Sequence, residues 1–213
     1  MLARKARLVK HNSRLSQGSL LDIGTGTGYF PHFMQERGWH VSAIEKSPQA
    51  RQFAKEHFEL DVAAPEALNE FADKSFDVIT LWHVMEHLEH LNETWETLKR
   101  ILKDQGILII AVPNPTSFDA EKYKEMWGAY DVPRHLWHFS PSVMQQFGAK
   151  HDFILCERHP MPFDAFYVSM LSEKYRKSAF PFIKGLITGA EAWIVSLAKK
   201  DRSSSMIYVF RKK

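Results

Sequence analysis

The sequence predicts an α/β fold, in which helices cover both faces of a mostly parallel sheet. Apolar strand patterns and helical patterns alternate along the first half of the chain, as they do in folds of this class. Residues 107–112 form a continuous apolar run, which is typical of a strand buried on both faces. A strand pattern at 19–23 runs directly into a turn with three glycines, and a helical pattern follows. Because the chain has 213 residues, of which 45% are hydrophobic, we expect one domain that carries an insertion.

The order of the elements follows from the capping and turn residues between the apolar segments. Ser47 and Pro48 provide a helix cap and a first helical residue, and Leu91, Trp95 and Leu98 share one helical face. The expected strands are 19–23, 39–45, 58–62, 76–81, 107–112, 153–157 and 206–210. The expected helices are 28–37, 47–57, one that contains Leu91 to Leu102 and ends before Gly106, and 141–148.

Two segments of the second half depart from this alternation. Residues 113–140 are rich in aromatic side chains and interrupted by prolines, which predicts an ordered loop or lid. Residues 160–202 separate the last two expected strands and show helical spacing, so we interpret them as a helical insertion within a single domain, 1–213. The apolar face of this insertion would cover a substrate, contact a second subunit of a homodimer or touch a membrane surface. Packing on the body or on a second subunit is the favoured interpretation.

Composition and charge exclude several classes of protein. The longest apolar runs, 107–112 and 192–198, are far shorter than the ~18 residues of a membrane-spanning helix. Cys156 is the single cysteine, and no apolar signal segment follows the basic N-terminal residues, so we expect a cytoplasmic protein without an intrachain disulfide. Basic residues gather at both ends and in the insertion, which leaves an acidic body. We therefore expect no nucleic-acid partner.

The turn Gly-Thr-Gly-Thr-Gly at 24–28 is the strongest candidate for a ligand site. Its glycines let a ligand approach backbone N–H groups closely, and the next helix offers its N-terminus to a carboxylate or phosphate. A dinucleotide fingerprint would need glycine where Tyr29 stands, and no Gly-Lys-Ser or Gly-Lys-Thr follows as in a P-loop. Glu45 ends the second expected strand at the same sheet edge, where its two oxygens would accept both hydroxyls of a ribose. Asp22 precedes the turn and is expected to orient its amides or to reach the ligand through water.

This glycine turn after an acidic residue resembles the cofactor motif of class I S-adenosylmethionine-dependent methyltransferases. Residues 76–88, Phe-Asp-Val-Ile-Thr-Leu-Trp-His-Val-Met-Glu-His-Leu, are similar to the segment after the fourth strand in the branch that includes ubiquinone-type O-methyltransferases. Residues 134–141, Arg-His-Leu-Trp-His-Phe-Ser-Pro, look like a segment of bacterial small-molecule methyltransferases of the same branch. The resemblance covers the first five expected strands, about half of the chain.

The resemblance implies a doubly wound, seven-stranded, mostly parallel sheet of the Rossmann-like methyltransferase type, whose last strand is antiparallel. It also implies S-adenosylmethionine as the cofactor, with the glycine turn on its methionine part, Glu45 on its ribose, and Leu81 and Trp82 flanking its adenosyl group. The acidic residue that meets the adenine stays open between Asp61 and Glu66. The candidate cofactor-binding residues are Asp22, Gly24, Thr25, Gly26, Gly28, Glu45, Lys46, Leu81 and Trp82.

The segment His83-Val-Met-Glu86-His87 matches the H-x-x-E-H pattern of some zinc hydrolases. That pattern needs a long helix and a further ligand, whereas here it follows a strand that would bind a cofactor. Some ubiquinone-type relatives bind a divalent cation through E-x-x-E-H at this place, but His83 replaces the first glutamate, and magnesium prefers oxygen ligands. We therefore favour a structural role for Glu86 and His87 in holding the turn, and we expect no metal.

We expect this protein to move the sulfonium methyl group of S-adenosylmethionine to an oxygen, nitrogen or carbon of a small-molecule acceptor. The acceptor would enter between 127–139 and 163–167. His135 and His138 are the candidate bases, with His83 behind them, although positioning alone can accelerate methyl transfer. One alternative is a non-catalytic S-adenosylmethionine-binding module. A nucleic-acid methyltransferase is less favoured, because no Asn-Pro-Pro-Tyr-type motif follows the strand at 76–81.

Overall fold

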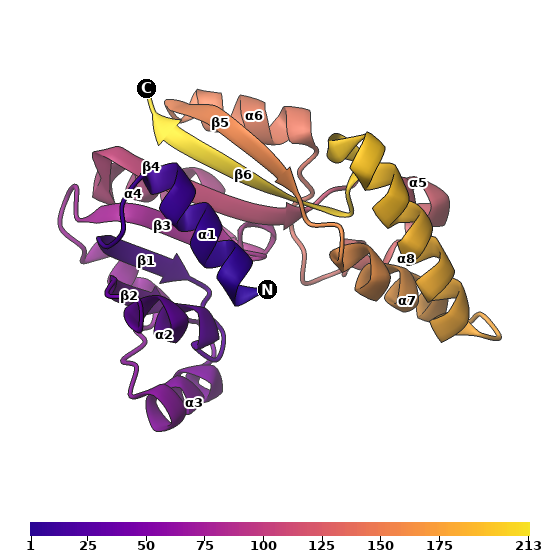
Figure 1. Ribbon diagram of the computed structural model, residues 1–213, viewed down its shortest axis with the longest axis horizontal. Helices are drawn as coiled ribbons and strands as arrows, with labels where there is room; N and C mark the ends of the chain where they lie inside the picture. Colours follow the sequence, from indigo (N-terminus) through magenta and orange to yellow (C-terminus); the bar gives the residue numbers. More distant parts are fainter.

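A six-stranded mixed sheet forms the centre of the molecule, which we describe from a computed structural model of residues 1–213 (Figure 1). The strand order is β2-β1-β3-β4-β6-β5, and the first four strands of this order are parallel. Strand β6 is antiparallel to both of its neighbours, as expected for the last strand. The strands are β1 (Ser19–Ile23), β2 (His40–Ile44), β3 (Phe76–Trp82), β4 (Leu102–Pro113), β5 (Phe153–Pro160) and β6 (Ser205–Lys212).

Helices cover both faces of this sheet and also form a projection beyond its edge (Figure 1). The α-helices are α1 (Leu2–Ser13), α2 (Tyr29–Gln35), α3 (Pro48–Phe58), α4 (Leu91–Ile101), α5 (Phe118–Tyr123), α6 (Pro141–Lys150), α7 (Asp164–Tyr175) and α8 (Pro181–Ala198). Short 3₁₀ helices are η1 (Pro65–Asn69), η2 (Met85–His87), η3 (Lys124–Met126), η4 (Gly128–Tyr130) and η5 (Lys200–Arg202). None of the helices combines the length and the apolar character needed to span a membrane.

Alternate residues of the central strands feed two hydrophobic cores. Val9 of α1 and Met34 of α2 pack with Ile107 and Ile109 on one face, whereas Trp95 of α4 lies in the core of the other face. Strand β4 is buried along its apolar run, because helices lie on both sides of it. The basic N-terminal segment is therefore part of the fold, since α1 buries an apolar side against the sheet.

The expected count of seven strands is wrong, because residues 58–62 do not form a strand. The backbone N–H of Leu60 donates to the carbonyl of Ala54, which ties this segment back to α3. Only Ala63 then reaches the edge strand, in a single parallel bridge with Ile44. The fourth expected helix ends before Gly106, at Ile101, but the strand expected from residue 107 already begins at Leu102, so Leu102 and Gly106 belong to β4.

The insertion folds into a hairpin of two helices, α7 and α8, which lies beyond the carboxyl ends of the parallel strands (Figure 1). Gly185 and Gly189 face α7, and a Cβ at these positions would lie 2.6 Å from the Cα of Met170 and 2.8 Å from the Cα of Phe166, respectively. The two helices therefore pack at a distance that only glycine permits. The aromatic segment 113–140, expected as an ordered loop or lid, contains α5, η3 and η4.

Candidate functional site

The glycine turn lies at the carboxyl end of β1, where the strand order reverses between β2 and β3. The N–H groups of Gly24 and Thr25 both donate to the carbonyl of Ile44, at 2.8 and 3.0 Å, so the turn is held against the end of β2. Gly24 has a φ of 68°, and a Cβ there would lie 2.3 Å from Cγ2 of Val84. Beside Gly26, in contrast, nothing lies within 4 Å of a Cβ position. The turn is thus built tightly at its base and leaves open space at its centre, as a ligand cradle requires.

Glu45 connects this turn to the next one. Its Oε2 accepts a hydrogen bond from the N–H of Gly26 at 2.8 Å, and its Oε1 accepts one from the N–H of Ser47 at 2.9 Å. Each carboxylate oxygen has a second acceptor site, so both hydroxyls of a ribose can still bind to this side chain. Lys46 points away into solvent, where its Nζ lies 3.7 Å from Glu89.

Behind the turn, Asp22 is buried and accepts a hydrogen bond from the hydroxyl of Thr80 at 2.5 Å. Burial raises the pKa of the Asp22 carboxyl to about 6, against the lowering effects of Thr80 and of the positive charge of Lys5. This side chain therefore joins β1 to β3 inside the core. The hydroxyl of Thr25 is also buried, and its interaction with the Asp22 carboxyl lowers the pKa of Asp22 as Thr80 does.

The two residues expected to flank an adenosyl group point to opposite faces of the sheet. Leu81 is fully buried in the core under α4 and α6, so only its backbone can contact a ligand. Trp82 packs edge-on against Phe30, and the ammonium group of Lys5 lies 4.3 Å from the centre of its ring. Burial lowers the pKa of Lys5, against the negative charges of Asp22 and Asp164.

His83 follows β3 directly and has a φ of 58°, in the left-handed region that few side chains adopt. Its Nδ1 lies 3.3 Å from Oε1 of Glu86, and its Nε2 lies 3.1 Å from Oδ2 of Asp164. Burial disfavours the charged ring, but hydrogen bonds and negative charge from Asp164 and Glu86 outweigh this and raise the pKa of His83 to about 9. His83 is therefore an imidazolium at pH 7, which links the turn after β3 to the first residue of α7.

A cavity of about 510 Å³ lies between α1, the end of β3 and the start of α7. Basic and apolar side chains share its wall. Its lining residues include Arg4, Lys5, Arg7, Trp82, Phe163 and Asp164. The expected acceptor entrance thus coincides with this cavity only on its insertion side, because no residue of 127–139 lines it.

His135 and His138 lie together in the segment before α6, with ring centres 6.4 Å apart. Nδ1 of His135 donates to the carbonyl of Ala129 at 2.8 Å, which leaves Nε2 as its free nitrogen. Burial and the neighbouring His135 lower the pKa of His138, so that its ring is neutral at pH 7.

Glu86, His87 and His135 bring one ligand atom each within 4.8 Å of one another. One carboxylate and two imidazoles suit a transition metal such as zinc better than magnesium. The carbonyl of Glu86 accepts from the N–H of Leu136, and Nδ1 of His87 donates to the carbonyl of Arg134. These bonds hold the segment before α6 against the turn after β3.

The comparison with known families agrees with this geometry. A family model described as a methyltransferase domain matches residues 1–156. The chain belongs to this methyltransferase family. An uncharacterized methyltransferase of Staphylococcus carnosus is 33% identical over 112 residues, which make up 52% of this chain and 53% of that protein. The ubiquinone biosynthesis O-methyltransferase of Pelagibacter ubique is 34% identical over 104 residues, 46% of this chain and 42% of that protein.

This methyltransferase domain spans about half the length of the curated relatives that it matches. Among solved structures, phosphoethanolamine N-methyltransferase 2 of Haemonchus contortus, in complex with S-adenosyl-L-methionine, has a TM-score of 0.66 at 22% identity. The match covers 99% of this chain and 52% of that one. At this identity the likeness shows the fold, which is the Rossmann-like fold of methyltransferases.

Two residues of the site could not be singled out from the sequence. Lys5 belongs to a run of basic residues with no motif, and only the packing of α1 against β3 brings it onto Trp82. Asp164 lies 81 positions after His83, so their contact depends on where the insertion folds back. The two adenine candidates are both exposed, and Asp61 makes an ion pair with Lys55 at 3.4 Å.

The pKa of His83 leads to a prediction about stability. Because it rises from 6.5 in the unfolded chain to about 9 in the folded one, the interaction stabilises the fold fully below pH 6.5 and is lost as pH rises through about 9. Asp164→Asn should therefore lower the free energy of unfolding more at about pH 6 than at about pH 10. Urea unfolding at both values, in buffers with a chelator, measures this difference.

Asp61→Asn is the matched control, because it removes an exposed carboxylate that pairs with Lys55 and not with a histidine. Its effect should stay the same between the two pH values. A titration of the His83 ring by nuclear magnetic resonance gives the second readout. An equal loss of stability at both pH values in Asp164→Asn, together with a midpoint near 6.5 in the wild type, would contradict the assignment.

Proposed function

We propose that this protein transfers the methyl group of S-adenosylmethionine to a small-molecule acceptor. The observation that carries the proposal is the Glu45 carboxylate, which is anchored at Gly26 and Ser47 beside an open turn at the switch point of the sheet. This is the place and the chemistry that a ribose needs. The family match and the S-adenosyl-L-methionine complex with the same fold support the choice of cofactor.

The residues of this chain divide the work between binding and positioning. The cofactor, when bound, supplies a methyl group on a positively charged sulfonium, which an acceptor displaces in line. Glu45 would hold the ribose, and the amides of the turn would hold the methionine part. The cavity beside Trp82 would hold the acceptor. The protonated His83 would not take the proton of an attacking hydroxyl. A neutral His138 would be able to do so only for an acceptor that extends from the cavity to the segment 127–139, because His138 does not line the cavity.

The wall of the cavity indicates the chemistry of the acceptor. Lys5 and Arg7 line it without an ion-pair partner, and its one carboxylate, Asp164, is already bound to His83. Trp82 and Phe163 add apolar surface. We infer an acceptor that combines an apolar body with a negatively charged group. The lone, exposed Cys156 supports a reducing, cytoplasmic setting.

A second candidate function is a module that binds S-adenosylmethionine without catalysis. The observation that favours it is the protonated His83, because it removes one of the three candidate bases from the site. Incubation with methyl-labelled S-adenosylmethionine and a pool of metabolites separates the two functions, since only the enzyme produces a labelled product.

The cofactor assignment predicts binding of S-adenosylmethionine and S-adenosylhomocysteine, and no binding of NAD. Glu45→Ala should weaken both by about 1–3 kcal/mol, because it removes a charged acceptor from the ribose hydroxyls. Isothermal titration calorimetry measures the affinities. Glu89→Gln is the control, since this exposed carboxylate pairs only with Lys46. The absence of heat with either ligand, or equal affinity in Glu45→Ala and the wild type, would refute the assignment.

The acceptor assignment predicts a change in KM without a matching change in kcat. Once an acceptor is identified, Arg7→Gln should raise its KM roughly tenfold, as the loss of a charge-assisted contact does. Lys10→Gln is the control, because Lys10 lies on the same helix but does not line the cavity. If KM stays unchanged in Arg7→Gln, or if the acceptor is neutral, the charge of the cavity has no role in recognition.

The assignment of the base predicts a loss of about 10²–10⁴ in rate for His138→Ala, with cofactor affinity unchanged. The same substitution at His135 tests the alternative base. Single-turnover rates of both variants, measured with saturating cofactor, decide between them. Rates near the wild type in both would mean that positioning, and not a histidine base, accelerates the reaction.

A further inference from the structure

The α7–α8 hairpin leaves one side of α8 uncovered. The side that faces α7 carries small residues, including Gly185, Thr188 and Gly189, all of them buried. The opposite side carries large apolar side chains. We call it the outer α8 face; its main residues are Phe182, Ile183, Ile187, Trp193, Ile194 and Leu197. Except for Trp193, each of them is between 55% and 65% exposed.

On an ordinary surface helix the large apolar side chains face the protein, whereas on α8 they face away from it. Residues three, four and seven positions apart lie on one side of a helix, so 183, 187, 194 and 197 form a continuous stripe. Soluble monomers rarely expose so many large apolar side chains together unless a partner covers them. The stripe continues to the tip of the hairpin, where Phe180 and Tyr175 are exposed as well.

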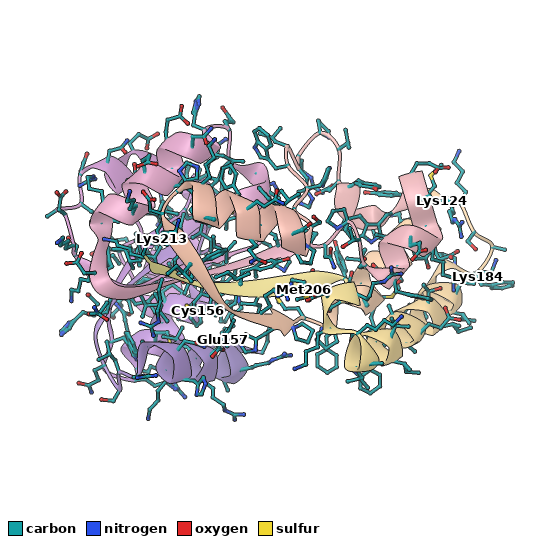
Figure 2. All side chains as sticks on the ribbon, turned by 90° about the horizontal axis from the view of Figure 1, so that it is seen from above. Lys124, Cys156, Glu157, Lys184, Met206 and Lys213 are labelled. Carbon is teal, nitrogen blue, oxygen red and sulfur yellow. The ribbon has the colours of Figure 1, made fainter.

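The charged side chains near the outer α8 face that have no ion-pair partner are all positive. Every acidic residue of 160–202 is already in an ion pair: Asp164 with His83, Glu173 with Arg176, Glu191 with Lys122, and Asp201 with Arg158. The lysines of the hairpin, in contrast, make no ion pair. They are Lys174, Lys177, Lys184, Lys199 and Lys200. Figure 2 shows Lys184 at the end of the hairpin that lies away from the sheet.

Apolar side chains flanked by unpaired lysines match an anionic lipid surface. Such a surface takes up aromatic and aliphatic side chains between its headgroups and acyl chains, and its phosphates attract lysines. A second copy of this chain fits less well, because it would bring two sets of unpaired lysines together without acidic partners. No helix spans a membrane, so the contact would be with the surface.

The outer α8 face also meets the wall of the cavity. The ring of Phe163, which lines the cavity, is stacked on Trp193 with ring centres 6.5 Å apart and an angle of 22° between the planes. A surface bound to this face would therefore lie beside the cavity. No element of the body covers this side of α8.

We propose that the outer α8 face and the lysines at the hairpin tip dock this protein onto an anionic membrane surface. The docking is independent of methyl transfer and would persist in a protein that binds no cofactor. If the protein also acts as proposed above, its acceptor can reach the cavity from the lipid.

Sedimentation with vesicles tests this proposal on the full chain. The vesicles contain either phosphatidylcholine alone or phosphatidylcholine and phosphatidylglycerol in equal parts. The wild type should sediment with the anionic vesicles, less so in high salt, and much less with the neutral ones. The double variant Ile183→Gln, Ile187→Gln should bind the anionic vesicles at least about tenfold more weakly, because it interrupts the apolar stripe.

A charge variant, Lys174→Gln, Lys177→Gln, Lys184→Gln, should lose a similar factor and its dependence on salt. Ile154→Gln is the matched apolar control, because Ile154 is 50% exposed on β5, outside the hairpin. It should bind as the wild type does. Thermal unfolding of each variant shows that the changes leave the fold intact, since all the altered side chains are at the surface.

Three results would overturn the proposal. The first is a wild type that does not bind anionic vesicles. The second is equal binding by the wild type and both hairpin variants. The third is a dimer in sedimentation velocity experiments that the substitutions at Ile183 and Ile187 abolish while vesicle binding is absent, which would identify a second copy as the partner of this face.

Discussion

The position of β6 between β4 and β5 is the constraint on which the rest of the structure depends. Because β6 is antiparallel to both, its first residues pair with the last residues of β4 and β5, at Pro113 and Pro160. The insertion between β5 and β6 must therefore start and finish at the carboxyl edge of the parallel strands. The glycine turn, Glu45 and His83 lie at the same edge, so the topology brings the hairpin next to the candidate cofactor site.

The side chain of His83 connects the hairpin to the candidate cofactor site. The imidazolium of His83 lies between Glu86, in the turn after β3, and Asp164, at the start of α7. The backbone of His83 is in the left-handed region, and Asp164 is also part of the cavity wall. A shift of α7 would therefore change the charge and the shape of the cavity together. In this view the insertion is part of the site and also the element that projects towards a partner surface.

Local patterns predicted most of the sheet, the glycine turn and the helical character of the segment between the last two strands, because these features depend on neighbouring residues. The strand expected at 58–62 failed since Leu60 bonds back to α3, a contact that no periodicity reveals. The role of Lys5 and the pairing of His83 with Asp164 depend on tertiary packing across the chain. The motif at 83–87 led us to expect a structural role for Glu86 and His87 in the turn, but the charge state of His83 follows from burial and from a partner 81 residues away.

We infer that a cofactor and an acceptor meet at the carboxyl edge of this sheet, and a crystal structure with S-adenosylhomocysteine would test this inference. In such a structure we expect the ribose hydroxyls to contact the carboxylate of Glu45, the amino-acid part to lie on the glycine turn, and the sulfur to face the cavity beside Trp82. A ligand bound elsewhere, or one that leaves Glu45 without a contact to the ribose, would contradict it.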